Sequence, residues 1–251
     1  MSMDRRLNWD GCFNVRDLGG IPVAGGHAVR RGAVVRSDAV DKLSADGWAA
    51  LCAHGVRTVI DLRNDDEVAA DAAPRPSDLT TVHLPLDGIE DTGFWSVWGD
   101  GPDGTPLYYR PFLDHFPDRA ARAVQAVAHA RPGGVLVHCA AGRDRTGLVT
   151  LLLLALAGAS PADIAADYLL SNDRLDARFF TTLGIPDHRQ EIADYLASKG
   201  TTAERALLTA LDGFDTAAHL RSGGLTPDDV AALRTRLLEP GGQPDVSRAD
   251  R

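Results

Sequence analysis

Residues 134–147 read GVLVHCAAGRDRTG and join two apolar runs through a loop of small and charged residues. The first run, rich in Val and Leu, is typical of a buried strand, and the second, residues 146–158, is typical of a buried helix. A loop that leads into a helix N-terminus presents free backbone N–H groups and the positive end of the helix dipole. This stretch therefore predicts a binding site for a phosphate dianion.

Cys139 and Arg145 stand in this loop with five residues between them. The field that attracts a phosphate also stabilises a thiolate, so we predict that Cys139 is a nucleophile. In a loop curled around one phosphate, this spacing brings the Arg145 guanidinium to the oxygens opposite the sulfur. There it can bind two oxygens at once and stabilise charge that develops in the transition state.

The other residues of the loop are predicted to bind the phosphate or to shape the loop. Gly142 allows the backbone to turn inward, close to the ligand. The Thr146 hydroxyl can donate to the thiolate as it leaves, and His138 is expected to fix the loop and to influence Cys139 electrostatically. The predicted substrate-binding residues are His138, Ala140, Ala141, Gly142, Arg143 and Thr146.

The composition of the chain limits what it can bind. Hydrophobic residues make up 44% of its 251 residues and charged ones 24%, as in globular proteins. A formal net charge of -9 gives little attraction to nucleic acid, so no nucleic-acid partner is expected and an anionic substrate needs a local positive site. The three cysteines have no metal-ligand spacing, which predicts no metal, cofactor or disulfide framework and indicates a reducing compartment; Cys12 and Cys52 are expected to be inert.

The sequence predicts a cytoplasmic protein. Its N-terminus is polar, without a secretory signal, and its longest apolar run, residues 148–159, is too short to be an integral membrane segment. Nothing in the sequence indicates an oligomeric state.

Strand and helix patterns alternate along the first part of the chain. Buried strands are predicted at residues 33–36, 57–62, 80–85 and 134–139, and helices at 44–54, 64–70, 116–130, 146–158, 160–170, 192–199, 202–211 and 226–238. This order predicts an α/β fold, with a mainly parallel sheet of four or five strands and helices on both faces. The phosphate site then lies at the carboxyl ends of the strands.

One insertion is unusually aromatic. Residues 88–117 hold seven of the chain's fifteen aromatic residues among glycines and prolines. A long connection of this kind is predicted to be a lid, with a small satellite core as the alternative. We predict a single domain over residues 1–240, with this lid, a helical extension over 171–240 and a disordered tail over 241–251.

Several segments together resemble a known family. The loop from His138 to Gly147 is similar to the phosphate loop of the protein tyrosine phosphatase superfamily. More narrowly, the chain resembles the bacterial and fungal group that includes mycobacterial protein tyrosine phosphatase B. The matching segments are residues 14–20 (NVRDLGG), 36–37 (RS), 59–63 (VIDLR) and 166–172 (ADYLLSN).

The resemblance implies a metal-independent phosphatase of the tyrosine or dual-specificity type that forms a phosphocysteine on Cys139. It also implies a general acid, for which two residues compete. Asp144 lies within the loop and is favoured modestly, although it could instead brace the loop by pairing with Arg16 or Arg63. Asp87 follows the strand predicted at residues 80–85, where related enzymes carry an acid, although it could be a turn residue. Members of the family can be exported without a signal peptide.

Arg143 stands where the family usually has lysine. A second basic residue in this loop resembles phosphatases that act on inositol phospholipids, so phosphoinositides are expected substrates beside phosphoprotein. The alternative is a surface charge that offsets Asp144.

Two other classes of protein fit the sequence less well than a phosphatase. Sulfurtransferases of the rhodanese type also place a cysteine at a strand-to-helix loop, but they lack the Arg-Thr-Gly ending that residues 145–147 provide. A phosphate-binding adaptor derived from a phosphatase would be expected to have lost Cys139 or Arg145, and both are present.

Overall fold

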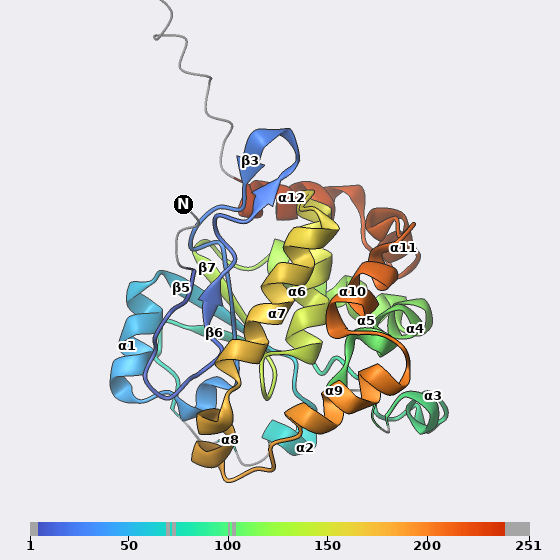
Figure 1. The fold of residues 1–251 in the computed structure, drawn as a ribbon. Coiled ribbons are helices and arrows are strands. Elements are labelled where there is room, and N and C mark those ends of the chain that lie inside the picture. The colour runs from blue at the N-terminus through green and yellow to red at the C-terminus, as the bar shows by residue number, and fades with distance from the viewer. Residues whose placement is uncertain (1–4, 69–70, 72–73, 100, 102–103, 239–251) are drawn as a thin grey trace, which may run out of the picture.

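The computed structural model describes residues 5–68, 71, 74–99, 101 and 104–238. Its main sheet has five strands in the order β1 (Arg16–Asp17), β4 (Val34–Ser37), β7 (Gly134–His138), β5 (Val56–Asp61) and β6 (Thr80–His83). The pairing of β1 with β4 is antiparallel and the other pairings are parallel. This confirms the predicted α/β fold with a mainly parallel sheet (Figure 1). A separate two-stranded ribbon pairs β2 (Pro22–Val23) with β3 (His27–Ala28).

Helices cover both faces of the sheet because alternate residues of its central strands point to opposite sides. Val135 and Val137 of β7 belong to the larger of two buried apolar clusters, and Leu136 belongs to the smaller one. The smaller cluster includes residues of α1 (Ala45–Ala53). The larger one includes α5 (Pro117–Ala128) and α6 (Asp144–Ala157), so α1 lies on one side of the sheet and these two on the other (Figure 1).

The aromatic insertion packs into the larger cluster. It forms α3 (Thr92–Trp98), a 3-10 turn (Pro106–Tyr108) and α4 (Tyr109–His115). Five of its seven aromatic side chains are buried in the same cluster as α5 and α6: Phe94, Tyr108, Tyr109, Phe112 and Phe116. These side chains therefore do not form a satellite core of their own.

The rest of the chain is helical. The elements are α7 (Pro161–Arg174), α8 (Ala177–Leu183), α9 (Arg189–Ser198), α10 (Ala203–Leu211), α11 (Thr216–Ser222) and α12 (Pro227–Leu237). The helices α10, α11 and α12 contribute to the larger cluster, whereas the buried Phe179 of α8 and Leu196 of α9 belong to neither cluster. Figure 1 shows α8 and α9 at the same end of the molecule as α2 (Asp65–Val68).

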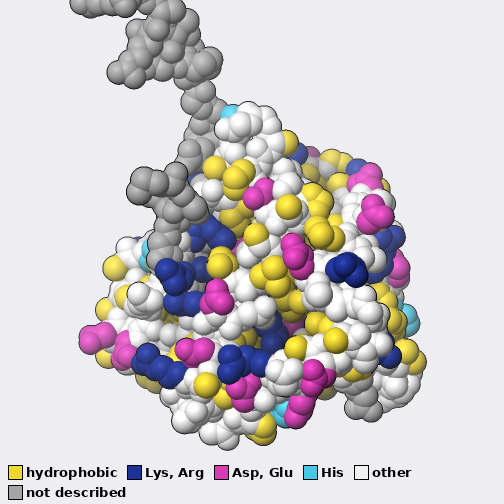
Figure 2. Space-filling model, in the orientation of Figure 1, with side chains coloured by type: hydrophobic (Ala, Val, Ile, Leu, Met, Phe, Trp, Pro, Cys, Tyr) yellow, Lys and Arg dark blue, Asp and Glu magenta, His cyan; other side chains and the backbone are white. Residues whose placement is uncertain are grey.

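Two observations concern the ends and the surface of the chain. The tail predicted over residues 241–251 lies outside the described residues, as do residues 69–70 of the helix predicted to begin at residue 64. Within the described part of the chain, no helix is long and apolar enough to cross a membrane. On the face that Figure 2 shows, acidic and basic side chains are intermixed with apolar ones.

Candidate active site

The loop between β7 and α6 has its carbonyl oxygens turned outward. Each carbonyl oxygen of residues 140–144 accepts a hydrogen bond from outside the loop. The bonds are Ala39 N to Ala140 O (2.9 Å), Asn14 Nδ2 to Ala141 O and Gly142 O (3.0 and 3.1 Å), Arg36 Nη2 to Gly142 O and Arg143 O (2.8 and 3.3 Å), and Tyr109 Oη to Asp144 O (2.7 Å). In a trans peptide the carbonyl oxygen and the following N–H point in opposite directions. The N–H groups of residues 141–145 therefore point away from these donors and toward the inside of the loop.

Two glycines allow this loop to sit so close to its neighbours. Gly142 has a φ of +66°, and a Cβ on it would lie 2.2 Å from the carbonyl oxygen of Ser37. A Cβ on Gly147 would lie 2.6 Å from the Tyr109 hydroxyl. Any larger residue at either position would push the loop or the start of α6 out of place.

A buried charged cluster lies behind the loop, and we call it the arginine brace: Asn14, Arg16, Arg36 and Asp167. Its side chains are at most 1% exposed. Asp167 lies 2.8 Å from Arg36 Nη1 and 3.3 Å from Arg16 Nε, and Arg5 Nη1 approaches it at 2.7 Å. Arg36 and Asn14 thus bind the loop carbonyls on one side, and Arg36 binds Asp167 on the other.

The brace is positively charged as a whole. Burial disfavours the ionised form of Asp167, but Arg16, Arg36 and Arg5 hold its pKa well below its usual range. Burial, followed by the charge of Arg36, lowers the pKa of Arg16 to about 9, so its guanidinium is still charged at neutral pH. Two of these arginines are fully buried beside a single carboxylate, which adds positive potential behind the phosphate loop.

A cavity of about 400 Å³ opens in front of the loop, and we call it the Cys139 cavity. It is lined by Asn64, Asp87, Ile89, Trp95, Gly104, Tyr108, Cys139, Ala140, Ala141, Asp144 and Arg145. All four residues predicted to be catalytic therefore lie around one space. Two side chains of its wall, the half-buried Trp95 and the buried Tyr108, come from the aromatic insertion, and Trp95 Nε1 donates to the carbonyl oxygen of Asp87 at 3.1 Å.

Of the predicted substrate-binding residues, Ala140 and Ala141 line this cavity, whereas His138, Gly142, Arg143 and Thr146 do not. Thr146 is fully buried, and its hydroxyl has no hydrogen-bond partner among the described residues. His138 is fully buried, with Nδ1 3.2 Å from the carbonyl oxygen of Cys139. Burial lowers the pKa of His138 to about 4, so at neutral pH the ring is uncharged and contributes a hydrogen bond in place of a positive charge.

Arg145 is held by a carboxylate that the sequence analysis did not identify. Its guanidinium binds Glu67 of α2 through both Nη atoms, with Nη2 2.7 Å from Oε1, and Asp87 Oδ2 lies 3.3 Å from Nη1. Burial would raise the pKa of Glu67, but the hydrogen bonds from Arg145 hold it below its usual value. A carboxylate bound to both arms of a guanidinium occupies the positions that two phosphate oxygens would take.

The two candidate acids have different partners. Asp144 accepts hydrogen bonds from Arg143 Nε at 3.2 Å and from the Tyr168 hydroxyl at 3.0 Å. Burial, followed by the charge of Asp144, raises the pKa of Tyr168, so the phenol keeps its proton and donates. Asp87 accepts from Asn64 Nδ2 at 2.9 Å and lies beside Arg145. Asp144 does not pair with Arg16 or Arg63, since Arg16 binds Asp167 and Arg63 binds Asp61.

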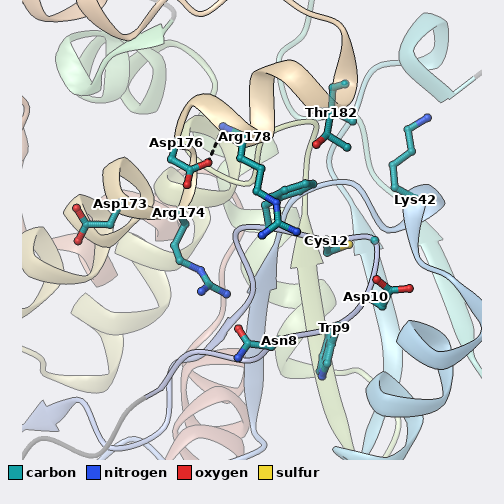
Figure 3. Close-up of a pocket in the computed structure, with 13 residues that line it drawn as sticks. Asn8, Trp9, Asp10, Cys12, Lys42, Asp173, Arg174, Asp176, Arg178 and Thr182 are labelled. Carbon is teal, nitrogen blue, oxygen red and sulfur yellow. Dashed lines mark hydrogen bonds between the residues drawn. The ribbon is translucent and has the colours of Figure 1, made fainter.

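Another large hollow, of about 860 Å³, lies between the N-terminal segment and α7–α8 and contains Cys12 (Figure 3). Its polar groups hold neighbouring segments together. Arg174 donates to the carbonyl oxygen of Leu7 at 3.1 Å, and Asp176 caps α8 by accepting from the backbone of Arg178 at 2.9 Å. Burial, followed by the charge of Asp38, raises the pKa of the Cys12 thiol, which disfavours its reactive thiolate form.

Known proteins are similar to this chain along most of its length. The model of the tyrosine phosphatase family matches residues 7–239. A tyrosine-protein phosphatase from Nostoc commune is 30% identical over 239 residues, which span 88% of this chain and 79% of the relative. The triple specificity protein phosphatase PtpB of Mycobacterium tuberculosis is 30% identical over 264 residues, which span 92% of this chain and 88% of the relative. Among solved structures, TpbA of P. aeruginosa in complex with pTyr matches 74% of this chain and 91% of its own at 20% identity, with a TM-score of 0.33.

Proposed function

The chain belongs to the tyrosine phosphatase family and is a cysteine-dependent phosphatase, and on that premise we propose that it hydrolyses phosphotyrosine in proteins through a phosphocysteine on Cys139. The observation that carries this proposal is that the carbonyl oxygens of residues 140–144 all accept hydrogen bonds from outside the loop. This arrangement leaves the N–H groups of residues 141–145 for the oxygens of a phosphate that faces the Cys139 sulfur.

In the first step the Cys139 thiolate attacks phosphorus. A sulfur–phosphorus bond forms, the ester phosphorus–oxygen bond breaks, and the leaving oxygen takes a proton from a carboxylic acid. Arg145 exchanges Glu67 for two oxygens of the transferring phosphoryl group. The exchange needs little movement, because Glu67 is only half-buried and Arg145 already lines the Cys139 cavity.

The contacts favour Asp87 as the acid, although Asp144 is the acid that the sequence favoured. Asp144 is held by Arg143 and by the Tyr168 hydroxyl. Asp87 lies 3.3 Å from Arg145, so its carboxyl is next to the guanidinium that binds the transferred phosphoryl group. Asp87→Asn is therefore expected to slow the first step more than Asp144→Asn.

In the second step water attacks the phosphocysteine. The carboxylate that gave its proton takes one from the water, the sulfur–phosphorus bond breaks, and inorganic phosphate leaves. The buried Thr146 hydroxyl supports this step, since it is available to donate to the sulfur as the thiolate is released. One hydrolysed ester thus consumes one water and returns Cys139 to its starting state.

The substrates are tested together. Because one relative is named a triple specificity protein phosphatase, phosphoserine and phosphothreonine peptides belong beside phosphotyrosine peptides. Phosphoinositides are the second candidate. Their support from Arg143 is weaker than the sequence predicted, since this side chain binds Asp144 and the Gly104 carbonyl and does not line the Cys139 cavity.

The deciding experiment compares wild type with Cys139→Ser, in the presence of a chelator, on phosphopeptides and on phosphoinositides. Cys12→Ser is the matched control, because Cys12 lies in a separate hollow and does not line the Cys139 cavity. The proposal expects phosphotyrosine hydrolysis that survives in Cys12→Ser and is lost in Cys139→Ser. Hydrolysis that persists without Cys139 would refute it.

A further inference from the structure

A second cavity, of about 480 Å³, adjoins the Cys139 cavity. The two share Gly104 and Ala141 in their walls, so a ligand can extend from one into the other. The other side chains of the second cavity come mainly from α8, α9 and the segment between them: Arg143, Leu175, Phe179, Phe180, Ile185, His188, Glu191, Ile192 and Tyr195. Figure 1 places α8 and α9 beside the end of the molecule where the phosphate loop meets α6.

Most of the wall of the second cavity is apolar, and its apolar side chains belong to neither of the two apolar clusters. Phe180, Ile192 and Tyr195 are half-buried, so part of their surface is in contact with water. Ile185 is 45% exposed, which is unusual for so large an apolar side chain. A ligand that covered these surfaces would remove apolar area from water, which is the main source of favourable binding energy.

Arg143 lines the second cavity alone, and it is bound to Gly104, which lines both cavities. Its Nε lies 3.2 Å from Asp144, its Nη2 donates to the Gly104 carbonyl at 3.2 Å, and its side chain is 13% exposed. Its charge is therefore already balanced by Asp144. The second cavity thus offers carbon surface beside a neutralised guanidinium, and it does not offer a second phosphate site.

We propose that the second cavity receives an apolar side chain of the phosphoprotein substrate, close in sequence to the phosphorylated residue. This rests on the proposed function and names the sequence feature that the same site selects. A peptide is favoured over a lipid acyl chain because the net charge of -9 opposes approach to an anionic membrane surface. One apolar group beside one phosphate is also what two adjoining cavities, one polar and one apolar, would recognise.

The test is a panel of soluble phosphotyrosine peptides that differ at one position near the phosphotyrosine, with Leu, Phe, Gly or Asp there. At one or more positions, wild type should hydrolyse the Leu and Phe peptides with a kcat/KM about tenfold or more above the Gly peptide, as burial of a large apolar side chain implies. Ile192→Asp, which places a charge on the cavity wall, should bring the Leu peptide to the level of the Gly peptide. Ala193→Asp, the next and exposed residue of α9, is the matched control and should keep the preference.

Phenyl phosphate has no group for the second cavity, so its hydrolysis reports the amount of folded, active enzyme in each preparation. A panel with equal kcat/KM at all positions, while phenyl phosphate is hydrolysed, would overturn this inference and leave the proposed function standing. The inference would also be overturned if wild type preferred phosphoinositide in vesicles over its soluble headgroup and Ile192→Asp removed that preference. The occupant of the second cavity would then be an acyl chain. Loss of all hydrolysis, phenyl phosphate included, would overturn both.

Discussion

Two arginine–carboxylate contacts flank the phosphate loop, and they differ in exposure. Behind the loop, Arg36 and Asp167 are each 1% exposed, and Arg36 also donates a hydrogen bond to the loop carbonyl of Gly142. In front of it, Arg145 and Glu67 are 15% and 27% exposed, and Arg145 lines the Cys139 cavity. The buried contact cannot exchange its partner without leaving a charge unpaired in the interior. The front contact can exchange its partner, because two phosphate oxygens would bind the Arg145 guanidinium in the same geometry as the two Glu67 oxygens.

This difference in exposure indicates that the Arg36–Asp167 contact has a structural role and that the Arg145–Glu67 contact takes part in the reaction. The arginine brace should govern stability and the shape of the loop, whereas the Arg145–Glu67 contact should govern phosphate binding and turnover. Four substitutions, in order of decreasing expected effect, test this division.

Asp167→Asn should disrupt the arginine brace and so destabilise the protein. It leaves two fully buried guanidiniums without their carboxylate, so we expect the free energy of unfolding to fall by about 3–5 kcal/mol and activity to be lost with it. Denaturant unfolding followed by fluorescence measures the change. Asp173→Asn, an exposed aspartate on the same helix, is the control. A stable but inactive Asp167→Asn protein would place the brace in the chemistry and contradict the division.

Arg145→Lys should have the opposite profile. Lysine keeps the charge but cannot bind two phosphate oxygens in a planar fork, so kcat should fall by about 10²–10³. The free energy of unfolding should change by only about 1 kcal/mol or less, because the contact with Glu67 is partly exposed. Steady-state kinetics and unfolding on the same preparation give both values. A large loss of stability with little loss of kcat would reverse our assignment.

The buried His138 predicts how the free energy of unfolding depends on pH, because burial keeps its ring uncharged in the folded protein. Its folded pKa is about 4 and its unfolded pKa about 6.5, so the unfolded chain binds more protons between these pH values. Stability should therefore fall by up to about 3 kcal/mol as the pH drops from about 6.5 to about 4, with no further loss from this group below that. Unfolding curves across this range should show a shallower slope for His138→Gln than for wild type. Identical slopes would mean that His138 is not buried as a neutral ring.

Glu67→Gln should have the smallest effect. Arg145 then loses its charged competitor, and inorganic phosphate should inhibit the variant at a concentration up to about fivefold lower than wild type. The inhibition constant for phosphate, measured at fixed pH and ionic strength, checks this. An inhibition constant that rises would indicate that Glu67 positions Arg145 for phosphate and does not compete with it.

The sequence predicted the parts of the molecule that local pattern determines. The strand over residues 134–138 and the helix that follows the loop were predictable from their apolar runs, and the phosphate loop from Cys139, Arg145 and Gly142. The family resemblance and the α/β fold are confirmed. The short helices α3, α8 and α11 were not predicted. Each has only seven residues, which is too few for a repeating pattern of apolar residues to be recognised. Their one local signal was an aspartate N-cap: Asp91, Asp176 and Asp215.

The contacts that could not be predicted are those that join distant segments. Asn14, Arg36 and Asp167 meet only because β4 and α7 pack against the loop, and no spacing in the sequence encodes that meeting. Glu67 was hidden in a run of three acidic residues, two of which are exposed. Only the fold shows which of the three reaches Arg145.

The central claim is that Cys139 carries the phosphoryl group during turnover. Rapid acid quench of wild type with a phosphotyrosine peptide, followed by proteolysis and mass spectrometry, tests it directly. We predict a mass gain of one phosphoryl group on the peptide that contains Cys139, and its absence in Cys139→Ser. A phosphoryl group on another residue, or turnover with no phosphorylated enzyme at any quench time, would contradict the account.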